Sequence, residues 1–244
     1  MAGHSKFANI KHRKERVDQK KGKVFTKLGR ELAMAVKHGG GGDPVSNIKL
    51  KDAIAKAKSF NMPNDTIERC IKKATGAESD SYEAVTYEGY GPSGVAVIVK
   101  VLTDNRNRAA SNVRHAFSKG GGSLGAPGCV SFMFREVGQI MVETDCGMDE
   151  ESLMLITADA GAEDFIPTEG GYEIITSVHS FSEVRETLEK QGIPMASAEI
   201  TQLAGTYVSL KTPDEVKLMN KMLDLLEDDD DVQNVFHNCE GLDS

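Results

Sequence analysis

The first third of the chain carries apolar residues at the three- and four-residue spacing of amphipathic helices. Phe25, Leu28, Leu32 and Ala35 make one apolar face. A proline at position 63, where a missing N–H costs nothing, suits the start of a later helix. The pattern predicts three helices that can form one small bundle, over residues 18–38, 47–60 and 63–75.

Beyond residue 76 the pattern changes to β-branched runs and short alternations separated by helical segments. The first segments predict a β-α-β unit: strand 94–102, helix 107–119 and strand 130–134. The middle predicts β-α-β-β-α-β: strand 138–143, helix 150–162, strands 163–168 and 171–177, helix 181–191 and strand 198–203. The last segments predict another β-α-β unit: strand 205–210, helix 213–226 and strand 232–238.

The middle segment has the complete element order of a ferredoxin-like domain, and an incomplete unit flanks it on each side. The economical arrangement pairs the two flanking units into one domain and inserts the middle one, because insertions need ends that lie close together at the surface. The expected fold is therefore α+β, with a helical N-terminal domain and two ferredoxin-like domains. The expected boundaries are 1–78 for the helical domain, 79–135 with 205–244 for the discontinuous domain, and 136–204 for the inserted one.

Charge is distributed very unevenly along the 244 residues, whose formal net charge is −8. Residues 1–76 hold 18 Lys and Arg against 7 Asp and Glu, a net of +11, so the remainder has a net of −19. A basic segment on an acidic protein points to a polyanionic partner, and nucleic acid is the usual one. The alternative is that these lysines only solvate helix surfaces.

Two groups of N-terminal residues are the candidate nucleic-acid contacts. Residues 1–16 read as a basic arm that becomes ordered against a partner, and the first helix carries a basic stripe at spacings of three and four. Together the candidates are Lys6, Phe7, Lys11, His12, Arg13, Lys14, Arg16, Lys20, Lys23, Lys27 and Arg30.

The segment Asp104-Asn-Arg-Asn-Arg108 is the sharpest polar cluster outside the basic region, at an expected strand-to-helix junction. Arginine can bind phosphate with two parallel hydrogen bonds, so Arg106 and Arg108 join the candidate nucleic-acid contacts. The competing interpretation is that Asp104 or Asn105 caps the helix and the arginines lie on the surface.

Motifs for catalysis or cofactor binding do not emerge from the sequence. The two G-x-G-x-x-G matches, at 89–94 and 120–125, do not leave a strand and open a helix, so both are expected to be turns. The four cysteines form no C-x-x-C pair, which favours free thiols over a zinc or redox site. We expect no catalytic residue, cofactor, metal or small-molecule substrate. No apolar run is long enough for a membrane span, and no signal sequence opens the chain, so the expected location is cytoplasmic.

Several segments, in order along nearly the whole chain, resemble the YebC/PmpR-type family of bacterial transcriptional regulatory proteins. They are residues 1–14, 22–27, 61–63, 87–92, 102–108, 113–119 and 231–238. Phe7 is a departure, since the family usually has Trp there; Phe keeps a stacking face and loses the indole donor.

This resemblance implies a three-domain, non-enzymatic, cytoplasmic protein. Bacterial members are described as DNA-binding regulators. A similar mitochondrial protein is the translational activator of cytochrome c oxidase, and related bacterial proteins are linked to relief of ribosome stalling at proline-rich sequences. The expected function is a transcriptional regulator that binds DNA through the basic N-terminal domain. The alternative is a ribosome-associated translation factor that binds ribosomal RNA.

Overall fold

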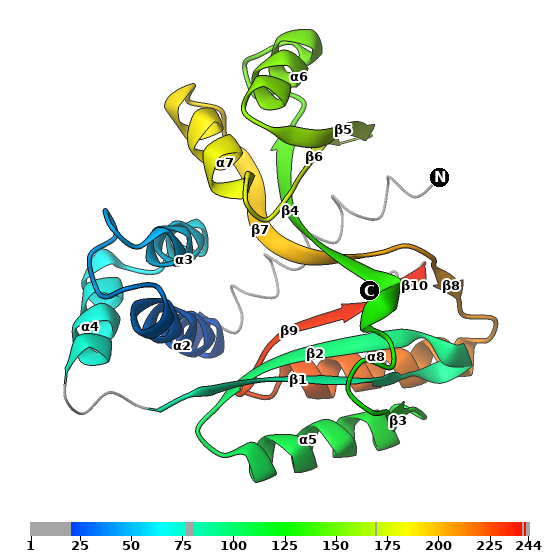
Figure 1. Cartoon of the computed structure of the whole chain (residues 1–244). Helices are drawn as coiled ribbons and strands as arrows, with labels where there is room; N and C mark the ends of the chain where they lie inside the picture. Colours follow the sequence, from blue (N-terminus) through cyan, green and yellow to red (C-terminus); the bar gives the residue numbers. More distant parts are fainter. Residues whose placement is uncertain (1–20, 77–80, 169, 241, 243–244) are drawn as a thin grey trace. The chain divides into compact units, whose positions relative to one another are not determined.

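The computed structural model describes residues 21–76, 81–168, 170–240 and 242 (Figure 1). These residues fall into two compact units. One comprises Glu136–Leu203, and the other comprises residues 21–135 with 204–242. The protein is α+β, with a helical N-terminal region followed by antiparallel sheets, as the sequence predicts.

The described part of the N-terminal region contains three helices: α2 (Lys21–His38), α3 (Ile48–Ser59) and α4 (Asn64–Thr75). The predicted apolar face of α2 is buried, with Leu32 fully covered by residues of α3 and α4. Gly29 lies inside α2 where a Cβ atom would stand only 3.3 Å from Cys70 Sγ, so it permits a close approach of α4.

Asn47 fixes the turn between α2 and α3. Its side-chain oxygen accepts a hydrogen bond from the N–H of Leu50, and its amide donates to the carbonyls of Ala35 and Gly41. Gly39 lies so close to this buried amide that a Cβ atom there would collide with it. The glycine-rich stretch between α2 and α3 is therefore held in a specific conformation by the hydrogen bonds of Asn47.

The flanking segments combine into one sheet of order β3-β1-β2-β9. Its strands are β1 (Glu83–Tyr90), β2 (Ala96–Thr103), β3 (Ser123–Leu124) and β9 (Val232–His237). The central pairs, β1 with β2 and β2 with β9, are antiparallel. The pairing of β2 with β9 joins the two halves of the chain that flank the inserted segment.

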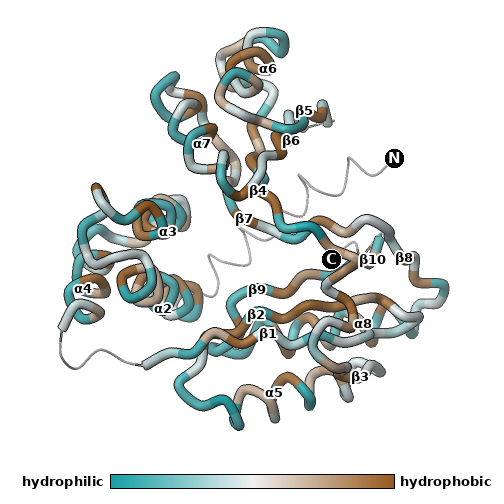
Figure 2. Tube along the Cα trace, viewed as in Figure 1, coloured by the Kyte–Doolittle hydropathy of each residue, from teal (hydrophilic) through white to brown (hydrophobic). Residues whose placement is uncertain are grey.

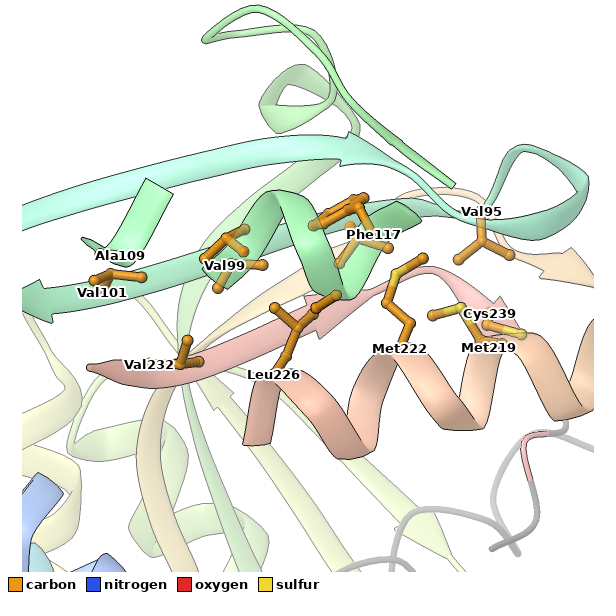
Figure 3. Close-up of a cluster of buried hydrophobic side chains, with 13 residues drawn as sticks. Val95, Val99, Val101, Ala109, Phe117, Met219, Met222, Leu226, Val232 and Cys239 are labelled. Atoms are coloured by element: carbon orange, nitrogen blue, oxygen red, sulfur yellow. The ribbon is translucent and has the colours of Figure 1, made fainter. Parts of the chain in front are cut away.

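Helices α5 (Arg106–Lys119) and α8 (Pro213–Glu227) pack against this sheet. Alternate residues of β2 point into the core, where Val99 lies with Phe117 of α5 and Met222 of α8 (Figure 3). The hydrophobic run along β2 is visible in Figure 2. Outside the main sheet, β8 (Val208–Ser209) pairs in parallel with β10 (Cys239–Glu240), so the strand predicted over 205–210 is shorter than expected.

The strand predicted over residues 130–134 is wrong. Ser131–Met133 is a single 3₁₀ turn, and Phe132 is 77% exposed. The buried carboxylate of Glu88 explains the difference, because it accepts the N–H groups of Gly128, Val130 and Ser131 at 2.8–2.9 Å. Those donors are no longer available for pairing with a strand, and β1, which the sequence analysis did not predict, pairs with β2 instead.

The inserted segment has the β-α-β-β-α-β order that the sequence predicts. Its elements are β4 (Phe134–Glu143), α6 (Glu150–Asp159), β5 (Ala162–Thr168), β6 (Gly171–Thr176), α7 (Phe181–Lys190) and β7 (Met195–Ala204). The sheet order is β5-β6-β4-β7, which is the ferredoxin-like arrangement. Ile140, Leu153, Ile174 and Leu188 are fully buried between this sheet and its two helices.

Candidate nucleic-acid interface

The thirteen candidate contact residues divide into two groups. Eight lie outside the described residues: Lys6, Phe7, Lys11, His12, Arg13, Lys14, Arg16 and Lys20. The structure describes the other five, namely Lys23, Lys27, Arg30, Arg106 and Arg108.

The basic stripe of α2 contacts the acidic turn that follows α8, which we define as Glu227–Asp231. Lys23 Nζ lies 3.1 Å from both the carbonyl oxygen and a carboxylate oxygen of Asp228. Lys27 donates to the carbonyl of Glu227 at 2.7 Å. Arg30 donates to the carbonyl of Asp230 and to the carboxylate of Asp231. Lys23, Lys27 and Arg30, the three described cations of the predicted stripe, are thus engaged by the protein's own carboxylates and carbonyls.

Asp231 is the centre of this contact. Its side chain is only 4% exposed and bonds to Arg30 at 2.7 Å and to Arg108 at 2.8 Å, while the Thr103 hydroxyl donates to it at 2.9 Å. Burial raises the pKa of this carboxyl, but the hydrogen bonds from Arg108, Thr103 and Arg30 outweigh burial and hold the pKa below its ordinary value. The main chain of Asp231 is also fixed, because its carbonyl accepts the N–H of Leu102 at 2.8 Å.

The environment of Lys27 reflects the same packing. Burial lowers the pKa of its ammonium group, and the nearby charges of Glu227, Asp229 and Asp230 oppose that shift. A cation that is partly desolvated and surrounded by fixed carboxylates is poorly placed to receive a phosphate group.

Arg106 and Arg108 also have partners within the chain. Asn105 caps α5 by accepting the N–H of Arg108 at 3.0 Å, which confirms the capping interpretation for that residue. Arg106 pairs with Glu83 at 3.0 Å, and Arg108 also pairs with Asp104 at 2.6 Å. The segment Asp104–Arg108 thus connects the start of α5 to the acidic turn through the ion pair of Arg108 with Asp231.

A cavity of about 590 Å³ opens beside this cluster. Lysine and arginine side chains and aspartates line it together, and several of them form the internal ion pairs described above, so the lining has no single sign of charge. The lining residues are Lys23, Arg30, Asp104, Arg108, Asn112, His115, Leu225 and Asp228–Asp231.

Most of the exposed cations of the described helical region lie on α3 and α4, with Lys37 near the end of α2 as a further one. The sequence analysis did not single them out. Six Lys and Arg side chains of α3 and α4 are exposed: Lys49, Lys51, Lys58, Arg69, Lys72 and Lys73. By contrast Lys23, Lys27 and Arg30 of α2 are all half-buried. Helical periodicity places both sets of cations on the polar faces of their helices and cannot tell them apart. What distinguishes the α2 cations is their contact with residues about 200 positions later in the chain.

Each of the two G-x-G-x-x-G segments contains a turn between elements, as predicted, together with residues of β1 or β3. Residues 89–94 end β1 and lead into β2, with Ser93 and Gly94 at φ values of 55° and 79°. Residues 120–125 follow α5, and a Cβ atom at Gly120 would collide with Met222 of α8. All four cysteines are free.

No group of three His, Cys, Asp or Glu side chains that could hold a metal ion occurs among the described residues. Within the same residues, no helix is both long enough and apolar enough to cross a membrane.

Two family models cover almost the whole chain. The one described as the TACO1/YebC protein N-terminal domain matches residues 5–77, and the one described as the TACO1/YebC second and third domain matches residues 82–239. The chain belongs to the TACO1/YebC family. The resemblance inferred from short sequence segments is thereby confirmed.

Relatives in this family are similar over their full length. A probable transcriptional regulatory protein of Agathobacter rectalis is 59% identical, over 98% of this chain and 100% of its own. Another with the same description, from Lachnoclostridium phytofermentans, is 58% identical, over 98% of this chain and 99% of its own. Among solved structures, the conserved hypothetical protein Aq1575 of Aquifex aeolicus is 44% identical and matches with a TM-score of 0.80 over 92% of both chains. The shared description supports a regulatory role for this TACO1/YebC protein.

Proposed function

We propose that this TACO1/YebC protein is a non-enzymatic, cytoplasmic regulator of gene expression that binds double-stranded DNA through its basic N-terminal domain. The observation that carries the proposal is the concentration of positive charge in that domain. Residues 1–76 have a net charge of +11 in a chain whose net charge is −8. Relatives that are 58–59% identical are described as probable transcriptional regulatory proteins, which supports the same role.

The proposed mode of binding is electrostatic. Lysine contacts to phosphate give affinity and orientation without reading base sequence. The acidic remainder of the chain repels DNA and keeps the basic domain facing it. No cofactor, metal or small-molecule substrate is part of the proposal.

A second candidate function is a ribosome-associated translation factor that binds ribosomal RNA and relieves stalling at proline-rich sequences. The exposed cations of α3 and α4 favour it as much as DNA, because five of the six are lysines, which grip phosphate as point charges whatever the base sequence. The two candidate functions predict different binding partners in the cell: DNA for the regulator and the ribosome for the translation factor.

Sedimentation of sheared cell extract separates them. The protein is followed through a sucrose gradient at near-physiological salt, after treatment with DNase, with RNase or with neither. Co-sedimentation with DNA fragments that DNase abolishes and RNase does not is the expected result. Co-sedimentation with ribosomes that RNase abolishes would replace the DNA proposal with the ribosomal one, and recovery at the top of every gradient would reject both.

A further inference from the structure

Helices α2, α3 and α4 all carry basic residues, but these residues differ in exposure and in their partners within the chain. On α2, three cations bond to the acidic turn Glu227–Asp231 at distances of 2.5–3.1 Å. A nucleic acid that used these cations would first have to break an internal network of ion pairs centred on a buried aspartate.

The exposed residues of α3 and α4 present the opposite situation. Against six exposed cations, the described residues of these two helices expose only two carboxylates, Asp65 and Glu68. The ammonium groups of three of the lysines, Lys49, Lys58 and Lys72, make no ion pair or hydrogen bond to any other described residue. Solvated, unpaired lysines can give up their counterions and water to a phosphate at little cost.

We infer that double-stranded DNA docks on the exposed lysines of α3 and α4, which we call the α3–α4 surface, and that the α2 stripe is structural. The inference rests on the proposed function and specifies where the DNA lies. Charge complementarity between the exposed lysines and the phosphates of the duplex is the reason for choosing DNA as the ligand of this surface. It also reassigns Lys23, Lys27 and Arg30, which the sequence alone presents as DNA contacts, to holding the helical region against the acidic turn.

Two triple variants of the full chain test this assignment. The surface variant is Lys49→Gln, Lys58→Gln and Lys72→Gln. Its matched control replaces three exposed lysines of α5 and α8: Lys119→Gln, Lys217→Gln and Lys221→Gln. Each removes three positive charges, so both have the same net charge, and glutamine keeps the helix propensity of lysine. The N-terminal residues 1–20 are unchanged in both, so any difference between the variants comes from the substituted lysines.

Binding to a labelled 20-base-pair DNA duplex is measured by fluorescence anisotropy from 50 to 300 mM salt. Each lost phosphate contact reduces the magnitude of the negative slope of log K against log salt by about 0.9, so the slope of the surface variant should be shallower by up to about 2.7. If the two affinities converge at about 1 M salt, the same relation predicts a loss of affinity of up to about 500-fold at 0.1 M salt. The control variant should keep the wild-type slope.

A third variant, Lys23→Gln, Lys27→Gln and Arg30→Gln, tests the α2 stripe. It should keep the wild-type slope while its melting temperature falls. If it does not fold, the pair Lys23→Gln and Lys27→Gln, which leaves Arg30 on Asp231, replaces it. A folded stripe variant with a reduced slope, beside a surface variant with the wild-type slope, overturns the inference and leaves the proposed function intact.

Two further outcomes have separate meanings. If the wild-type chain binds no duplex at any salt concentration, the proposed function itself fails. If an RNA duplex of the same sequence binds through the α3–α4 surface and the DNA duplex does not, DNA is the wrong occupant and the inference is overturned.

Discussion

Replacing Asp231 with asparagine removes the charge that holds three parts of the chain together. In the native protein its two carboxylate oxygens accept hydrogen bonds from Arg30 of α2, Arg108 of α5 and the hydroxyl of Thr103 on β2. Asparagine has nearly the same shape, but it offers one acceptor oxygen and no charge. The substitution therefore tests the ion pairs with little change in packing.

The magnitude follows from the burial of the partners. Removing one member of a buried ion pair costs about 3–5 kcal/mol, because the other charge stays desolvated and unpaired. The Arg30 side chain is 15% exposed and loses its only carboxylate partner among the described residues, whereas the Arg108 side chain is 45% exposed and keeps Asp104. The expected cost lies at the lower end, about 3 kcal/mol, which corresponds to a fall in melting temperature of roughly 6–12 °C for a unit of this size.

Urea unfolding and thermal melts of D231N against the wild type measure this loss. The matched control is D230N, because the Asp230 side chain is exposed and its contact to Arg30 uses the main-chain carbonyl; we expect a change within about 0.5 kcal/mol. Because the folded pKa of Asp231 is depressed, its contribution is present above the unfolded pKa and is lost as pH falls through the folded pKa. D231N should therefore lose less stability than the wild type under acid conditions. A D231N protein as stable as D230N would refute the reasoning.

Three further predictions concern the fold. Glu88→Gln should lower the free energy of unfolding by about 2 kcal/mol, because an amide accepts fewer of the three N–H groups that the buried carboxylate holds; an unchanged urea midpoint would contradict it. Gly39→Ala should destabilise the helical region by about 1–3 kcal/mol, because the added methyl collides with Asn47, whereas Gly40→Asn, at a left-handed position with open space, should cost less in the same thermal melt. Burial lowers the pKa of His237, so its contribution to stability is present above its unfolded pKa near 6.5 and is lost as pH falls below that value; melts between pH 8 and 5 should show a shallower decline for His237→Asn, and parallel curves would count against the assignment.

Local periodicity predicted the elements whose partners are close in sequence. The apolar face of α2 and the full element order of the inserted ferredoxin-like segment followed from spacing, because each of these elements buries one face against its neighbours. The alternation of Val130, Phe132 and Phe134 predicted a strand, and the structure has a 3₁₀ turn there because Glu88, some 40 residues earlier, binds its N–H groups.

The candidate site shows the same limit more sharply. Spacing alone found the basic stripe on α2, but it could not show that the stripe contacts a turn about 200 residues later in the chain. The Asp104–Arg108 cluster was correctly located at a helix start, where Asn105 is the cap and Asp231 is the partner of Arg108. The α2 cations are partly buried because they pair with residues far away in the sequence. A short stretch of sequence does not reveal such long-range pairs.

The most direct test of a nucleic-acid-binding regulator is the salt dependence of duplex binding by the unmodified chain. With about six phosphate contacts, log K plotted against log salt should fall with a slope near −5 on double-stranded DNA. A slope close to zero would contradict the electrostatic account, because binding without counterion release would not use the lysines and arginines of the N-terminal domain.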